Sequence, residues 1–293
     1  MRVRLAARSP FQLQTVVNSH GWIQLAPFAA TEGGGLRYVT RLSSGRVTAV
    51  AVEAIADGVA AEVEDELDSA ESASLNAQLS WMLGLEQDFS EFYALARQEP
   101  KLAQMAARAQ GRVLRSPTLF EDVIKTMLTV NTTWSGTIRM NAALVRQYGS
   151  AWPGDPTRHA FPTPEQLADL DEPTLRATVK AGFRTPYILG LARAVAAGDL
   201  DLEGLKSAEF STPDLKKRLL AIKGIGDYAA ANLLMILGRY DHIPIDSWAL
   251  KVVSYEWPMD RPAERQDVEN AFARWGAWKG LAFWFWDWSY YHQ

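Results

Sequence analysis

The sequence predicts an α+β fold in which an N-terminal antiparallel β-sheet domain packs beside a mostly α-helical domain. Residues 10–54 alternate apolar and polar side chains in short runs separated by turns, which is the period of half-buried strands. From about residue 88 onward, the apolar residues recur with helical spacing. A chain of 293 residues is long enough for two domains. We expect a sheet domain with an acidic segment over 1–88 and a helical domain over 89–293.

Four alternating runs predict the strands of an antiparallel meander. The runs are LQTVV (13–17), WIQLAPF (22–28), LRYVTRL (36–42) and RVTAVAV (46–52). The turns between them contain Gly, Ser and Asn, at 18–21, 32–35 and 43–45. An acidic loop follows and leads into a helix expected near 72–84.

Three helix starts are marked by a threonine that can cap the first turn. Thr118 follows Ser116-Pro117 and has Glu121 three residues later, the spacing of a capping box. Two further threonines stand directly before a proline and an acidic residue, in Thr163-Pro164-Glu165 and Thr212-Pro213-Asp214.

The charges are unevenly distributed along the chain. The formal net charge is −4, but residues 53–91 carry 11 acids and no Lys or Arg. Outside that segment the chain has 30 basic and 23 acidic residues, a net charge of +7. Residues 100–146 are especially basic. One acidic and one basic surface are therefore expected, and a basic surface suits nucleic acid. The alternative is that both segments are ordinary solvated helix faces.

Composition excludes several classes of site. The chain has no cysteine, which rules out disulfides, thiol catalysis and cysteine-ligated zinc or iron–sulfur clusters. Its four histidines are not spaced as metal ligands, so we expect no metal site. No run of 18 apolar residues predicts a transmembrane helix, and the N-terminus does not resemble a signal peptide. A cytoplasmic location is expected.

Residues 219–248 contain the most informative motif. Gly224 and Gly226 stand between two apolar helical patterns, where glycine allows a sharp turn. Asp227 is expected to cap a helix over 228–237, and Gly238 to end it. The unpaired amides at the start of a helix favour an anion, and a nucleic-acid phosphate is the obvious repeating anion.

This motif, followed by Pro244-Ile245-Asp246 and Trp248, resembles the helix-hairpin-helix (HhH-GPD) DNA glycosylase superfamily. The branch it resembles is that of the alkyladenine and 8-oxoguanine glycosylases without an iron–sulfur cluster. The resemblance extends over about 100–293, including a wedge-bearing helix-loop-helix at 121–149. It implies two helical lobes, with a hairpin lobe at about 118–245. The active-site cleft is then expected between the lobes.

The resemblance also implies a set of site residues. Asp246 matches the catalytic aspartate, and the same side chain can cap the helix that starts near Ser247. The other expected positions are the DNA-binding hairpin (Lys223, Gly224, Ile225, Gly226), the wedge loop (Asn131, Thr132, Thr133, Trp134) and the base pocket (Tyr228, Trp248, Phe283, Asp287). For Trp134, insertion into DNA and simple packing both remain open. No cofactor is required, although a monovalent cation bound by hairpin backbone carbonyls fits the pattern.

Departures from the family pattern narrow the range of expected substrates. Tyr228 stands where bifunctional glycosylases have a Schiff-base lysine, which indicates a monofunctional enzyme. Gly136 replaces the arginine used against the opposite cytosine. Phe283 and Asp287 replace the glutamine and phenylalanine that grip 8-oxoguanine. Aromatic rings stabilise a cationic base through cation–π interactions. An alkylated purine is therefore the expected substrate.

The expected activity is therefore base excision from double-stranded DNA that contains a damaged base. The enzyme is expected to be a monomer with no membrane association, associated with the nucleoid. Two alternatives remain: a glycosylase for oxidised or deaminated bases, and a non-catalytic DNA-binding protein. The C-terminal aromatic cluster, Trp275 to Tyr291, is expected to be mostly core packing, with Phe283 the first candidate to face the pocket.

Overall fold

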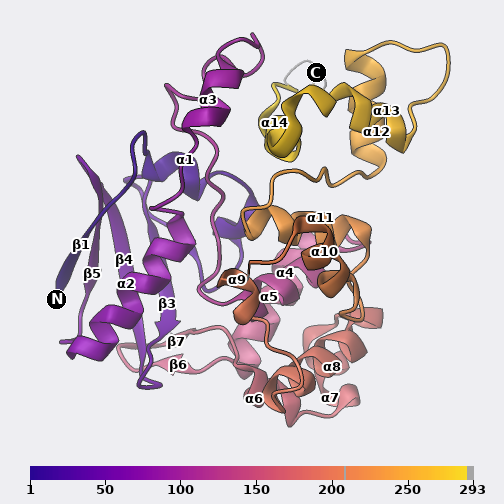
Figure 1. Cartoon of the computed structure of the whole chain (residues 1–293). Helices are drawn as coiled ribbons and strands as arrows, with labels where there is room; N and C mark the ends of the chain where they lie inside the picture. The colour runs from indigo at the N-terminus through magenta and orange to yellow at the C-terminus, as the bar shows by residue number, and fades with distance from the viewer. Residues whose placement is uncertain (208, 289–293) are drawn as a thin grey trace. The chain divides into compact units, whose positions relative to one another are not determined.

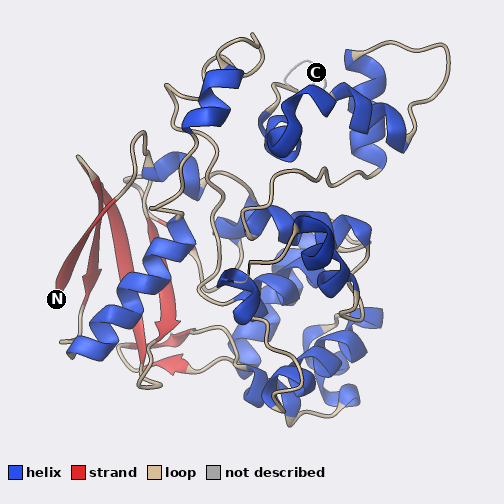
Figure 2. Cartoon of the chain, viewed as in Figure 1, coloured by secondary structure: helices blue, strands red, loops and turns tan. Residues whose placement is uncertain are grey.

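The computed structural model describes residues 1–207 and 209–288, and it confirms an α+β fold with an N-terminal antiparallel sheet (Figures 1 and 2). The chain forms two compact units. Unit 1 comprises residues 1–87 and 112–208, and unit 2 comprises residues 88–111 and 209–293. The sequence-based division at residue 88 stays a prediction.

The sheet of unit 1 has five antiparallel strands in the order β1-β5-β4-β3-β2. The strands are β1 (Arg2–Ala6), β2 (Ala29–Ala30), β3 (Leu36–Arg41), β4 (Val47–Ile55) and β5 (Gly58–Val63). Tyr38 pairs with Val50 and Leu36 with Val52, and all four side chains are buried. Arg37, on the opposite face of β3, is exposed. The expected strands 36–42 and 46–52 are therefore confirmed.

The first two expected strands of the meander are wrong. LQTVV forms α1 (Leu13–Val17), and the start of WIQLAPF lies in the 3-10 helix η1 (Gly21–Gln24). In α1 the buried residues are Leu13, Val16 and Val17, which is the spacing of one helix face. A run of five residues fits either period, so alternation alone does not decide between strand and helix.

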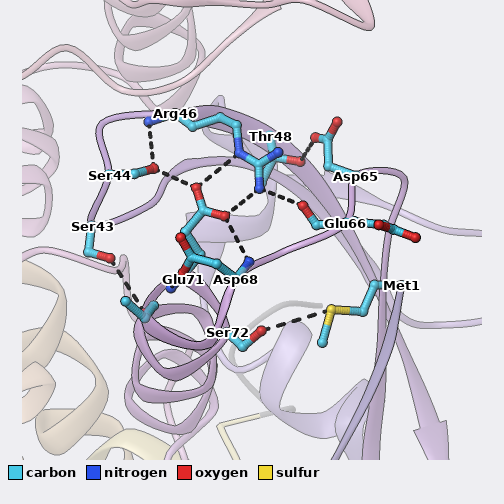
Figure 3. A network of polar contacts seen from close by, with 11 residues as sticks. Met1, Ser43, Ser44, Arg46, Thr48, Asp65, Glu66, Asp68, Glu71 and Ser72 are labelled. Atoms are coloured by element: carbon cyan, nitrogen blue, oxygen red, sulfur yellow. Dashed lines mark hydrogen bonds and ion pairs between the residues drawn. The ribbon is translucent and has the colours of Figure 1, made fainter.

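The acidic segment leads into α2 (Ser69–Leu83), which lies along the sheet in Figure 1. Asp68 and Glu71 form a capping box at its start. Glu71 also accepts hydrogen bonds from Arg46 Nε at 3.1 Å and from Ser44 Oγ at 2.6 Å (Figure 3). These contacts join the β3–β4 turn to the helix and lower the pKa of Glu71. Part of the acidic segment thus has a structural role.

The remaining helices of unit 1 follow the sheet in the chain. They are α4 (Leu119–Thr129), α5 (Trp134–Tyr148), α6 (Pro164–Ala168), α7 (Glu172–Val179), η2 (Gly182–Arg184), α8 (Thr185–Ala196) and α9 (Gly204–Ser207). Thr118 caps α4 and Thr163 caps α6, as predicted. Residues 88–293 are not helical throughout, because β6 (Ala151–Trp152) and β7 (Asp155–His159) form an antiparallel hairpin.

Helix α4 is buried along most of its length and carries charged side chains into the interior. Lys125 Nζ lies 2.6 Å from Glu121 Oε1, and both side chains are almost fully buried. Tyr38 donates its hydroxyl to Glu121, and Trp22 donates its indole N–H to Asp122 at 2.7 Å. A buried charge is tolerated when it is paired and hydrogen-bonded, and these contacts supply both.

Unit 2 is helical. It contains α3 (Ser90–Ala96), α10 (Thr212–Leu220), α11 (Asp227–Ile236), α12 (Ser247–Glu256), α13 (Arg265–Ala271), η3 (Ala273–Trp278) and α14 (Lys279–Phe285). Ser211 caps α10, one residue before the predicted Thr212. Phe92 of α3 packs against Trp275 and Trp278, so much of the C-terminal aromatic cluster is core. Tyr290 and Tyr291 lie outside the described residues.

Two further findings concern the described residues only. None of their helices combines the length and apolar character needed to cross a bilayer. Nor do their His, Asp and Glu side chains form a group of three that could hold a metal ion.

Candidate functional site: the hairpin, the Asp246 loop and the wedge loop

The hairpin predicted at Lys223, Gly224, Ile225 and Gly226 is the turn between α10 and α11. Gly224 has a φ of +93°, a conformation that side chains other than glycine rarely adopt. Ile222 and Ile225 are buried and anchor the turn, and the Ile225 N–H donates to the Ile222 carbonyl at 3.0 Å. Lys223 is exposed at the tip. The turn therefore exposes Lys223 and Gly224 between the two buried isoleucines, and Gly226, which follows Ile225, is exposed as well.

Gly226, rather than the predicted Asp227, is the N-cap of α11. Asp227 is the first helical residue and lies 3.3 Å from Lys216 Nζ of α10. Because Gly226 has no side chain, no side-chain oxygen caps the first turn of α11. A Cβ at Gly226 would meet no atom within 4 Å. The start of α11 thus offers open amides on an open surface.

Asp246 is the N-cap of α12, as predicted. Its Oδ1 accepts a hydrogen bond of 2.9 Å from the Ala249 N–H. The side chain is partly exposed, whereas Ile243, Pro244 and Ile245 before it are buried. In the part of the chain that the structure describes, the cap uses Oδ1, which leaves Oδ2 for a substrate.

The loop that carries Asp246 is held at its backbone. The Gly280 N–H donates to the Tyr240 carbonyl at 2.7 Å, and the Tyr240 ring stacks on Trp278 with centroids 5.6 Å apart. A Cβ at Gly280 would lie 2.0 Å from the His242 carbonyl oxygen. Arg265 donates to the Ile245 carbonyl at 3.4 Å. Helix α14 and α13 therefore fix the path of the loop.

Aromatic side chains lie near Asp246 in unit 2. Trp248, two residues after it, is 40% exposed, and its ring meets Phe283 and Trp288 edge-on at 6.0 and 5.7 Å. Tyr228, in the first turn of α11, is 39% exposed. Burial, and then the charge of Asp246, raise the pKa of Tyr228, so its hydroxyl keeps its proton at neutral pH.

The two C-terminal pocket positions differ in exposure. Phe283 is 3% exposed and packs against Phe272 with ring centroids 5.5 Å apart. Asp287 is exposed and lies beyond α14, which ends at Phe285. Asp287 was expected on the last helix, and that expectation is wrong. The Asp287 carbonyl accepts from Lys101 Nζ at 3.3 Å. Contact of either residue with a base stays a prediction.

The wedge loop predicted at 131–134 lies in unit 1, between α4 and α5. Asn131 is exposed and has a φ of +48°. Thr133 caps α5 by accepting from the Gly136 N–H at 3.2 Å. A Cβ at Gly136 would lie 2.5 Å from Thr132 Oγ1. A side chain at position 136, where the 8-oxoguanine branch has an arginine, would therefore require the exposed Thr132 side chain to move.

Trp134 packs against the N-terminal part of unit 1. Its indole N–H donates to Gln24 Oε1 at 3.0 Å, and a Cβ at Gly21 would lie 2.2 Å from its ring. Trp134 is nevertheless 37% exposed. The sequence left open whether Trp134 packs or inserts into DNA. The structure shows a packing contact, and part of the Trp134 ring stays accessible.

Two residues beside the wedge loop were not singled out by the sequence. Arg184, 6% exposed, donates to the Val130 carbonyl, directly before Asn131. Phe183 is 50% exposed, and its ring lies 4.4 Å from the Arg184 guanidinium carbon. The signal available in the sequence was an aromatic–arginine pair directly before the Thr185-Pro186 helix start.

Comparison with known proteins identifies the family and the fold. The profile of the HhH-GPD superfamily base excision DNA repair proteins matches residues 124–277. A DNA-3-methyladenine glycosylase of Bacillus subtilis (strain 168) is 29% identical over 211 residues, 69% of this chain and 68% of the relative. Two solved structures share the fold at 22% identity. MBOgg1 with a low-affinity DNA ligand has a TM-score of 0.76 and covers 100% of this chain and 96% of its own. The 3-methyladenine DNA glycosylase of Archaeoglobus fulgidus has a TM-score of 0.74, with 97% and 96% covered.

Proposed function

The chain belongs to the HhH-GPD superfamily of base excision DNA repair proteins, and on that premise we propose that Asp246 is its catalytic carboxylate. The chain is a DNA glycosylase, a hydrolase of the N-glycosidic bond. The finer proposal is a monofunctional enzyme that removes alkylated purines from double-stranded DNA. The alternatives of another lesion class and of a non-catalytic DNA-binding protein are outcomes of the test below.

One observation carries the proposal. Asp246 is held by its own cap on α12, with Oδ2 left for a substrate, and exposed Trp248 lies two residues further along the helix. Burial raises the pKa of Tyr228 and the nearby charge of Asp246 raises it further, which supports a site where α11 and α12 begin. A carboxylate oriented by a helix start and accompanied by exposed rings suits a flipped base and its sugar.

The chemistry follows from the bond that must break. When the C1′–N bond cleaves, its electron pair leaves with the base and positive charge develops on the sugar. The Asp246 carboxylate stabilises that charge and takes a proton from the water whose oxygen bonds to C1′. The N–H of Ala249 donates to Oδ1 and holds the carboxylate in one orientation. The products are a free base and an intact abasic site.

The side chains around Asp246 favour an alkylated purine. Tyr228 replaces a Schiff-base lysine and cannot form an imine, which supports hydrolysis without strand cleavage. Exposed Trp248 and partly exposed Tyr228 offer ring faces to a cationic base, an interaction of ~0.5–2 kcal/mol. At the start of α5, Gly136 stands where the 8-oxoguanine branch has the arginine used against the opposite cytosine. A positively charged base also leaves as a neutral molecule, so it needs less assistance.

The hairpin is proposed to hold the DNA backbone. The open amides at the start of α11 can donate to a phosphate, and the helix dipole favours the negative charge. Exposed Lys223 adds a charge-assisted contact at the tip. Such contacts position the duplex but carry no information on the lesion.

Three smaller parts of the proposal concern the setting of the reaction. The enzyme needs no cofactor, and a monovalent cation held by backbone carbonyls of the turn 221–226 would add positive charge where a phosphate binds. It acts as a monomer on duplex DNA. It works in the cytoplasm, associated with the nucleoid.

Base release from a panel of duplexes tests the function. Wild-type protein is incubated with duplexes containing 3-methyladenine, 1,N6-ethenoadenine, uracil or 8-oxoguanine opposite cytosine, and released base is measured. We expect the alkylated purines to be released fastest, with no covalent adduct after borohydride treatment. Faster release of 8-oxoguanine or uracil would show that the preferred substrate is that base and not an alkylated purine. A covalent adduct would show that the enzyme also has lyase activity. Binding without release of any base would leave only the DNA-binding alternative.

A further inference from the structure

We infer that Arg184 is a positioning residue that fixes the backbone of the wedge loop, so that Asn131 is presented in one conformation before DNA arrives. The inference rests on the proposed function and on the wedge loop predicted at Asn131, Thr132, Thr133 and Trp134, which is expected to enter the DNA. It concerns η2, which is distant in sequence from the loop and lies outside the motif that predicted it.

The carbonyl groups at the end of α4 are taken by side chains. Thr129 donates its hydroxyl to the Thr126 carbonyl at 2.7 Å, and Thr137 of α5 donates to the Leu128 carbonyl at 2.9 Å. Arg184 donates to the carbonyl of Val130, the C-cap of α4. The last carbonyls of a helix lack the usual helical donors, so these side chains, together with the Val130 N–H on the Met127 carbonyl, fix how the chain leaves α4.

Arg184 is the donor closest to the tip of the loop. Its target, Val130, is followed directly by Asn131, whose φ is +48°. Asparagine tolerates this left-handed conformation better than most residues, but it still needs support from its surroundings. A guanidinium that holds the preceding carbonyl supplies that support, because it fixes the peptide plane from which Asn131 projects.

The burial of Arg184 also needs a physical account. Its side chain is 6% exposed, and among the described residues no carboxylate pairs with it. A buried cation without a counter-charge is costly. Here the negative end of α4 and the carbonyl groups of Val130 and Ala181 take the place of an acid. Phe183 covers the outer face of the guanidinium at 4.4 Å.

A second contact holds the other end of the same loop. Trp134, the first residue of α5, is fixed by Gln24 and Gly21 of η1. The exposed residues Asn131, Thr132 and Thr133 therefore lie between two fixed ends. A short loop with fixed ends loses little conformational entropy when it enters DNA, so the binding energy goes into opening the base pair.

A double-mutant cycle with Asn131 tests the inference. Single-turnover base release at saturating DNA and the DNA dissociation constant are measured for Arg184→Met, Arg184→Lys, Asn131→Ala and the combination of Arg184→Met with Asn131→Ala. We expect Arg184→Met to slow base release by about 10- to 100-fold, since a 1 Å misplacement costs about that much. We expect Arg184→Lys to recover part of the rate, and the dissociation constant to change by less than about threefold.

The cycle distinguishes positioning from direct contact with DNA. If Arg184 acts through Asn131, Arg184→Met in the Asn131→Ala background should cost less than about threefold. Equal losses in both backgrounds, or a loss of affinity as large as the loss of rate, would overturn the inference. Arg193→Met is the matched control, because Arg193 of α8, like Arg184, donates to backbone carbonyls, those of Ala168 and Leu170.

Backbone hydrogen exchange gives a readout that does not depend on catalysis. We expect amides 131–136 to exchange faster in Arg184→Met than in the wild type, and Arg193→Met to leave them unchanged. Unchanged exchange in Arg184→Met would overturn the inference. A failure of the proposed function would appear separately, as a wild-type protein that releases no base from any duplex.

Discussion

The backbone N–H of Gly280 donates a 2.7 Å hydrogen bond to the carbonyl of Tyr240, which joins α14 to the loop carrying Asp246. A Cβ at position 280 would lie 2.0 Å from the His242 carbonyl oxygen, so the contact needs glycine. The loop that carries Asp246 and the aromatic helix α14 of unit 2 are thus packed together. Any change in that packing is transmitted to the backbone that holds the carboxylate.

Gly280→Ala should both slow base release and lower stability. The new methyl group forces the 240–242 backbone away from α14, at a cost of ~1–3 kcal/mol in the free energy of unfolding. The accompanying displacement of Asp246 should reduce the single-turnover rate by about 10²-fold. Thermal denaturation and single-turnover base release are measured together. Gly190→Ala in α8 is the control, since its Cβ would meet nothing within 4 Å. Wild-type rates in Gly280→Ala would show that this contact does not position Asp246.

Gly226→Ala should weaken DNA binding without disturbing the fold. The φ of Gly226 is −97°, which alanine adopts easily, and the added Cβ points into open space. The methyl group should instead obstruct a phosphate that approaches the open amides of α11. We expect affinity for damaged and undamaged duplexes to fall alike, by about tenfold or about 1.4 kcal/mol.

Titration of DNA at fixed salt concentration measures this effect, since affinity depends strongly on salt. Gly33→Ala is the control, because its Cβ would also meet nothing within 4 Å and it lies in unit 1. Unchanged affinity of folded Gly226→Ala protein would remove the hairpin from the DNA interface.

The sequence predicted those parts of the site whose signals are local. Gly224 and Gly226 indicate a turn, so the hairpin could be predicted from neighbouring residues. Asp246 stands directly before a helical pattern, so the cap of α12 could be predicted in the same way. The capping residue of α11 was misplaced by one position, because Gly226 and Asp227 are both good N-caps.

The contacts that position the site were not predictable in this way. Arg184 reaches Val130 across 54 residues, and Gly280 reaches a carbonyl far earlier in the chain. Such pairs depend on how helices pack, which no short pattern encodes. The same limit explains why residues 13–17 were assigned to a strand, since five residues fit both periods.

His20 should make stability fall under mildly acidic conditions. Burial lowers the pKa of His20 to about 4, and its Nε2 lies 2.7 Å from the Leu114 carbonyl oxygen. Below pH 6.5 the unfolded chain takes up a proton at this position and the folded chain does not, so stability is lost as the pH falls toward 4. Asp122 acts in the opposite direction, because burial raises its pKa to about 6 and the folded state binds the proton first.

Replacement of the imidazole isolates its contribution. Relative to the wild type, His20→Gln should gain about 2–3 kcal/mol in the free energy of unfolding between pH 7 and pH 4.5. Denaturant unfolding at the two pH values measures this difference. His159→Gln on β7, where the histidine is partly exposed, is the control. The same pH dependence in His20→Gln and wild-type protein would contradict a buried, neutral histidine.

The most direct test of the account is the single-turnover rate of base release by Asp246→Asn on a duplex containing 3-methyladenine or 1,N6-ethenoadenine. Asparagine keeps the cap on α12, so the fold and DNA affinity should be preserved while the negative charge is lost. The account predicts a rate about 10²-fold or more below the wild type, equivalent to ~3 kcal/mol of transition-state stabilisation. Base release at near wild-type rates, with DNA affinity unchanged, would contradict the assignment of Asp246 as the catalytic carboxylate.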